Sequence, residues 1–363
     1  MKFIYICAAL LVATEFSYCW NAPTHMVISQ IAWNNMTPST KQSVASLLST
    51  PISYPGTQEL SAKTSTIQTA SLWAETLNES NWKSLVQKKF NKNLQILTIQ
   101  TYISQSSSAG PIMRYYSTAY ISSNGDNLAY GIESAEKVLS SSSGISNNTK
   151  AIALRYLISF VGNATQPFQV SNPFMNSQNT ESARLIFLQV PLNIPGVLDV
   201  SGTQDQTLYA LWNDAGGVFS FSSNSDAIEN AKVLSQQIRT SAQDIEQMYS
   251  NNSKANYLVS LASVRDWAIE TNKLAIQALQ NNNKKIAYNF QNGASDNKII
   301  MFNDERYTEF VQNMSKQQVY VAGMRLANVL NAIFDPNNAN FTYTSYITRD
   351  VVANGNITNI YQF

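Results

Sequence analysis

Three polar side chains, Ser159, Asn163 and Gln169, lie around the end of one predicted helix. Apolar residues recur at helical spacing through residues 154–161, which predicts a buried helix there. Ser159 and Asn163 are four residues apart and therefore share one face of that helix. Pro167 lies just beyond the helix, and we expect Gln169 in the loop that follows. His, Asp and His at these three positions would form a metal site, but here all three side chains are neutral.

The donor inventory of the whole chain is equally poor in metal ligands. His25 is the one histidine, and the two cysteines, Cys7 and Cys19, lie at the N-terminal end. Zinc binds imidazole, thiolate and carboxylate, normally four groups per ion. A Ser-His-Asp triad would have to use His25, and the sequence has no Gly-X-Ser-X-Gly elbow and no P-loop. A serine-type triad is therefore not indicated, whereas paired acids in a cleft stay open as an alternative that no spacing singles out.

Residues 1–19 have the pattern of a secretory signal peptide. Lys2 supplies the basic start, residues 4–13 form an apolar run, and Ser17 and Cys19 are the small residues before the cleavage site. The run is too short for a membrane span. We therefore expect a secreted or periplasmic protein whose mature chain begins at Trp20 and has no thiol. The formal net charge of +1 gives no basic field for holding nucleic acid.

The elements that position these side chains are mostly helical by pattern. Thr37-Pro38 predicts the cap of a helix through Leu48, and residues 67–77 and 133–139 are helical. Residues 93–102 and 184–190 predict short strands, whereas residues 50–62 and 105–127 are expected to be loops. Residues 226–334 are almost entirely helical by pattern, and residues 208–213 fit a helix or a turn. We expect one all-α, multi-helix domain over residues 20–334, with long loops, a short strand or hairpin, and an Asn-rich tail at 335–363.

Several short motifs occur in an order that is similar to a known family, the secreted single-strand-specific zinc nucleases of the S-one/P-one type and the related bacterial zinc phospholipases C. The matching segments are Trp20 with His25, Trp73-Ala74-Glu75, residues 160–167 (FVGNATQP), residues 208–213 (LYALWN), Trp267-Ala268 and residues 323–328 (GMRLAN). The resemblance covers residues 20–334. It implies an all-helical fold with three zinc ions in a cleft and hydrolysis of phosphodiester and phosphomonoester bonds.

Carried over position by position, the resemblance shows how far the zinc ligands depart from the family. Trp20, which chelates through its amine and carbonyl in the family, and His25 match, and Glu75 replaces an Asp. The other six positions lack a good zinc ligand: Gln95, Ser159, Asn163, Gln169, Tyr209 and Asn213. Asp214 is next to the last of them, but one residue along a helix turns a side chain away by about 100°.

These substitutions predict a catalytically inactive family member, a pseudoenzyme that acts as a binding scaffold without a cofactor. We expect neutral amides and hydroxyls to form a hydrogen-bonded plug in place of the metals. Its ligand or protein partner is not indicated, and nucleic acid or a nucleotide is suggested by the resemblance alone. One alternative is an active phosphoesterase with a single zinc at Trp20, His25 and Glu75; another is a decoy or inhibitor of an active relative. His25, Glu75 and Tyr209 also fit plain structural roles.

Overall fold

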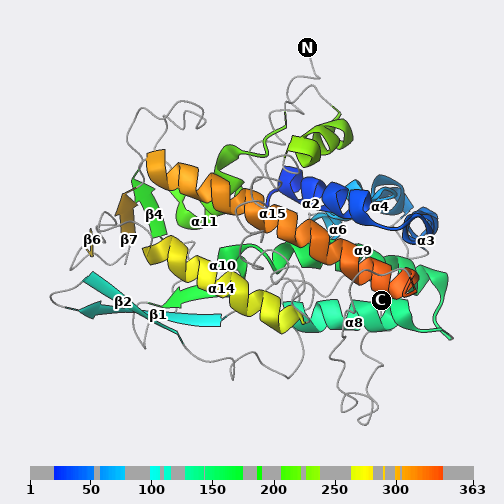
Figure 1. Cartoon of the computed structure of the whole chain (residues 1–363), viewed down its shortest axis with the longest axis horizontal. Helices are drawn as coiled ribbons and strands as arrows, with labels where there is room; N and C mark the ends of the chain where they lie inside the picture. Colours follow the sequence, from blue (N-terminus) through cyan, green and yellow to red (C-terminus); the bar gives the residue numbers. More distant parts are fainter. Residues whose placement is uncertain are drawn as a thin grey trace, which may run out of the picture.

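The structure of the chain is a computed structural model, and it shows a helical body with two small sheets at one end (Figure 1). It describes residues 20–52, 58–77, 99–106, 110–115, 127–142, 144–174, 186–189, 206–221, 226–237, 263–280, 289–290, 299–302 and 305–337. Gln95, the 1–19 segment and almost all of the 335–363 tail therefore lie outside the described residues. The mostly helical architecture agrees with the predicted fold class.

The helical body contains long helices and several short ones. The helices are α2 (Ala22–Asn35), α3 (Pro38–Ser49), α4 (Gln58–Lys63), α5 (Ile67–Ala70), α6 (Trp73–Thr76), α8 (Leu128–Ser140), α9 (Asn147–Asn163), α10 (Pro167–Val170), α11 (Leu208–Asn213), α14 (Val264–Gln280) and α15 (Glu305–Phe334), with a 3-10 turn, η3 (Ala215–Gly217). Residues 227–237 are also helical. None of the described helices is both long and apolar enough to cross a membrane.

Side-chain caps fix where the principal helices begin. The Asn21, Thr37, Asn127 and Ser146 side chains each accept a hydrogen bond from the backbone N–H three residues later. Such caps satisfy one of the N–H groups that a helix leaves unpaired at its N-terminus. A cap at Thr37 followed by Pro38 is the start that the sequence predicts for α3.

Helix α15 runs through the middle of the body and packs along α2, with α9 also in contact (Figure 1). The crossing with α2 is close at Gly323, where an added Cβ would lie 2.6 Å from Ile31 Cβ and 2.9 Å from the Ile28 carbonyl oxygen. Helices α8 and α9 pair on the other side. The largest buried cluster joins residues of α3, α5, α6, α8, α9, α14 and α15, so α9 is surrounded by the hydrophobic core.

Two small sheets lie at the same end of the body (Figure 1). One has the order β2-β1-β3, formed by β1 (Ile99–Ser106), β2 (Gly110–Tyr115) and β3 (Ser171–Phe174). The other has the order β5-β4-β7-β6, formed by β4 (Ile186–Gln189), β5 (Gln206–Thr207), β6 (Asn289–Phe290) and β7 (Ile299–Phe302). β1 pairs antiparallel with β2 and parallel with β3, whereas β4 is parallel to β7.

Several local predictions need correction. Residues 105–127 are not all loop, because β2 pairs with β1 as a hairpin. The 226–334 region is interrupted by β6 and β7, and the predicted 50–62 loop ends where α4 begins. The 67–77 segment is two short helices, and the ambiguous 208–213 segment is a helix. The strand expected at 184–190 is confirmed as β4, and the one at 93–102 is confirmed over its described residues, 99–102, which begin β1.

Candidate functional site

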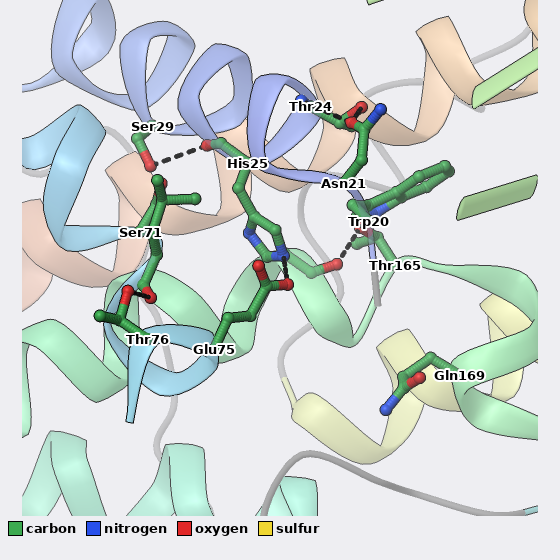
Figure 2. Close-up of polar contacts among 12 residues, drawn as sticks. Trp20, Asn21, Thr24, His25, Ser29, Ser71, Glu75, Thr76, Thr165 and Gln169 are labelled. Carbon is green, nitrogen blue, oxygen red and sulfur yellow. Dashed lines mark hydrogen bonds and ion pairs between the residues drawn. The ribbon is translucent and has the colours of Figure 1, made fainter. Parts of the chain in front are cut away.

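The start of the described chain is buried against the end of α9. Trp20 is fully buried, and its indole Nε1 donates to the Thr165 hydroxyl at 3.4 Å (Figure 2). Thr165 lies in the turn after α9, and its hydroxyl in turn donates to the Gly162 carbonyl at 2.8 Å. Trp20 therefore lies beside the helix end that the sequence singles out.

His25 lies on the first turns of α2 and faces Glu75 of α6 (Figure 2). Its Nε2 is 3.7 Å from Glu75 Oε1; the histidine side chain is 0% exposed and the glutamate side chain is 20% exposed. Burial lowers the pKa of His25 from 6.5 to about 3. The imidazole is therefore neutral at pH 7, even though the Glu75 carboxylate favours the charged form, because desolvation of the ring outweighs that attraction.

Helix α9 approaches the His25 ring at Gly162. A Cβ added at Gly162 would lie 2.8 Å from His25 Cε1 and 2.9 Å from Nδ1. A side chain at this position would therefore displace the imidazole. Three segments that are far apart in the sequence, the N-terminal segment, α6 and the end of α9, thus meet around one histidine.

Ser159 and Asn163 are fully buried on α9. The Ser159 hydroxyl and both polar atoms of the Asn163 amide have no hydrogen-bond partner within the described part of the chain. Buried polar groups are normally paired, and each exception costs free energy. The expected hydrogen-bonded plug is therefore not formed at these two positions among the residues that the structure describes.

A hydrogen bond of the kind expected for the plug joins one pair of these side chains. The Tyr209 hydroxyl on α11 donates to Gln169 Oε1 at 3.2 Å, and both side chains are buried. Gln169 lies in the short helix α10 and not in a loop as expected, and its backbone N–H donates to the side-chain oxygen of Gln166. Figure 2 shows Gln169 well away from the His25–Glu75 pair. The positions that the resemblance assigns to zinc ligands therefore separate into two groups.

Asn213 contacts the N-terminal segment through its backbone. Its carbonyl oxygen accepts from the Asn21 N–H at 2.9 Å, whereas its side-chain oxygen has no partner within the described part of the structure. Asp214 Oδ1 accepts from Asn21 Nδ2 at 2.6 Å. Sequence reasoning missed Asn21. The Asn-X-Pro pattern at 21–23 indicates a helix cap, but nothing local indicates the partner 193 residues away.

The donor set does not fit three zinc ions. The chain has one histidine and no cysteine after residue 19. Within the described residues, no group of three or more His, Cys, Asp and Glu side chains is placed to share a metal ion. Amide and hydroxyl oxygens are weak zinc ligands. His25 and Glu75 are two donors, half the number that a structural zinc takes.

Comparison with known proteins gives a match over most of the chain. The model of the S1/P1 nuclease family matches residues 20–335. No curated protein matches the chain. The family match begins at the buried Trp20 and ends beside the last turn of α15, so it contains every element described above. The chain therefore belongs to the S1/P1 nuclease family.

Proposed function

We propose that this chain is a pseudoenzyme of the S1/P1 nuclease family, a secreted helical scaffold that has lost zinc-dependent hydrolysis and acts by binding. One observation carries the proposal. Positions that the resemblance assigns to zinc ligands hold neutral side chains: Gln95, Ser159, Asn163, Gln169, Tyr209 and Asn213. Residues 20–335 still match the family, which supports a retained scaffold.

The chemistry of the family depends on what zinc supplies. A bound zinc polarises a phosphoryl oxygen and lowers the pKa of a bound water to about 7. Asn163 stands where the family has a carboxylate that bridges two ions, and a neutral amide does not replace its charge. His25, the chain's one histidine, is buried and faces Glu75, which supports a structural role over that of a general base for a hydroxyl nucleophile.

A second candidate is an active phosphoesterase with one zinc. The observation that favours it is the 3.7 Å approach of His25 Nε2 to Glu75 Oε1, next to the buried Trp20. Neutral imidazole is the form that binds metals, and the low pKa of His25 keeps it neutral. A cleaved N-terminus at Trp20 would add the amine and carbonyl that the resemblance implies.

The two candidates differ in metal content and turnover. The mature protein starting at Trp20 is purified without chelator or metal-binding tag, and its zinc is measured by elemental analysis. Hydrolysis of single-stranded DNA and RNA, mononucleotides and phosphatidylcholine is then measured with and without EDTA. An active family enzyme is assayed in parallel as a positive control.

If the protein is a pseudoenzyme, we expect a zinc content near zero per chain and no turnover of any of these substrates. Turnover that EDTA abolishes, and that the His25→Ala variant lacks, would refute it and support the single-zinc enzyme. Two or three zinc ions per chain would show that the position-by-position assignment of ligands is wrong.

A further inference from the structure

Arg155 is a fully buried arginine in the middle of α9, and its guanidinium contacts the ends of two other helices. Its Nε donates to the Thr64 hydroxyl just after α4 at 2.9 Å, and one terminal nitrogen donates to the Leu48 carbonyl of α3 at 2.9 Å. The other terminal nitrogen donates to the Ala151 carbonyl of α9 at 3.0 Å. Leu48 lies in the last turn of α3, where carbonyl groups have no partner within the helix. Arg155 therefore ties the ends of α3 and α4 to α9.

The same guanidinium lies over the indole of Trp73, the first residue of α6. The distance from Arg155 Cζ to the ring centroid is 5.6 Å, which is within the range of a cation–π interaction. Tyr156, the next residue of α9, meets the same indole edge to face, with ring centroids 6.4 Å apart. Helix α6 is only four residues long, and its N-cap residue, Leu72, makes no side-chain capping hydrogen bond. Packing of Trp73 against α9 therefore contributes to holding this short helix.

The same side of α9 also reaches the imidazole of His25. Arg155 and Gly162 are seven residues apart, close to two full turns, so they share one side of the helix about 10 Å apart along its axis. A Cβ added at Gly162 would lie 2.8 Å from His25 Cε1. Glu75, two residues after Trp73 in α6, faces the same ring, with its Oε1 3.7 Å from Nε2. One side of α9 therefore contacts both the imidazole and the helix that carries the carboxylate.

We propose that Arg155 is a positioning residue that, by holding α6, fixes the Glu75 carboxylate against the His25 imidazole. It acts through Trp73 and touches neither member of the pair in this role. Lysine does not replace it, because an ammonium group has neither the planar face that stacks on an indole nor the fork of donors that arginine directs to several acceptors. The inference goes beyond the proposed function, since it concerns how the pair is placed and not whether the chain hydrolyses phosphate esters.

The test compares Arg155→Lys with a matched control, Arg325→Lys. Arg155→Lys keeps the positive charge and the apolar stem but loses the planar group. Arg325 is also buried, and its Cζ lies 5.2 Å from the centroid of the Trp267 ring. It is two residues from Gly323, where α15 approaches α2, and two residues turn a helix by about 200°, so Arg325 faces away from the helix that carries His25. Both variants therefore lose a buried arginine–tryptophan stack, but in different parts of the core.

Two local measurements follow the site. The first is hydrogen exchange of the backbone amides of Thr76 and Leu77, which donate to the carbonyls of Leu72 and Trp73 and report local opening of α6. The second is the set of imidazole C–H NMR signals, which in a chain with one histidine reports the surroundings of His25. Both are recorded at pH 7.5 in EDTA, and thermal unfolding is followed by circular dichroism.

In Arg155→Lys we expect the α6 amides to exchange about tenfold faster relative to amides of α15, and the His25 signals to move. In Arg325→Lys we expect a lower Tm with neither local change. Thr64→Val is a milder variant that removes one acceptor of Arg155 and keeps the shape of the side chain. It should move both measurements in the same direction as Arg155→Lys, by less.

A folded Arg155→Lys variant with the α6 exchange and His25 signals of the unsubstituted chain would overturn the proposal. Equal local changes in Arg325→Lys would also overturn it, because they would show a general loosening of the core. If Arg155→Lys does not fold, Thr64→Val decides by the same two measurements, and an absence of change there overturns the proposal. Zinc content and turnover, which decide the proposed function, do not enter this test.

Discussion

Acidification should destabilise the protein through one residue, because His25 is the chain's single histidine. Its pKa is lowered from 6.5 to about 3 by complete burial. The unfolded chain therefore binds a proton near pH 6.5 that the folded chain does not bind until about pH 3. The stabilising effect is complete above pH 6.5 and is lost progressively as the pH falls from 6.5 to about 3.

The size of the effect follows from that difference. One pKa unit corresponds to about 1.4 kcal/mol, so the free energy of unfolding should fall by about 1 kcal/mol between pH 7 and 5.5 and by about 2 kcal/mol at pH 5. Partial burial raises the pKa of the Glu133 and Asp214 carboxyls, and their titration acts in the opposite direction. Comparison with a variant that lacks His25 therefore isolates the contribution of the imidazole.

Two measurements in EDTA check this prediction. Urea unfolding at several pH values gives the change of the free energy of unfolding with pH. This change should be almost absent in the His25→Gln variant, whatever the stability of that variant at pH 7. NMR of the folded protein should show one set of imidazole C–H signals that do not titrate between pH 7.5 and 5. A midpoint at or above pH 6.5, or stability that rises on acidification, would refute the reasoning and show that the Glu75 carboxylate outweighs burial.

Three substitutions test the packing around the site. Gly162→Ala should cost about 1–2 kcal/mol in urea unfolding, because the new Cβ would lie 2.8 Å from the buried imidazole. Gly323→Ala should cost more, about 3 kcal/mol, because its Cβ would meet Ile31 Cβ and a backbone carbonyl that cannot rotate away; equal costs would contradict this order. Tyr209→Phe should cost about 1 kcal/mol by removing the hydrogen bond to Gln169, and an unchanged stability would show that this bond contributes nothing.

Local chemistry explains what the sequence predicts well. The Thr37-Pro38 start of α3 and the apolar spacing within α9 are signals contained in a few consecutive residues, and both helices are present. The meeting of Trp20, His25 and Glu75 with the end of α9 was predictable from the family motifs. These predictions required either a short pattern or a resemblance.

The missed features depend on residues far apart in the chain. β2 was expected to be loop because a Ser/Gly-rich segment has weak strand preference, and pairing with β1 decides its structure. The Asn21–Asp214 bond joins residues 193 positions apart, and no periodicity indicates it. A loop is expected at Gln169 because Pro167 follows a helix. Proline is also common as the first residue of a helix, however, and Pro167 has that position in α10.

Burial accounts for which residue types stand at several positions that the resemblance assigns to zinc ligands. Ser159 and Asn163 are fully buried, and a neutral group left unpaired there costs about 1–3 kcal/mol, whereas an uncompensated buried charge costs several kcal/mol. Glu75 keeps its carboxylate, and its side chain is 20% exposed to water. His25 is fully buried and is neutral at pH 7. Among these four residues, the charge at pH 7 therefore lies on Glu75, the one whose side chain solvent reaches.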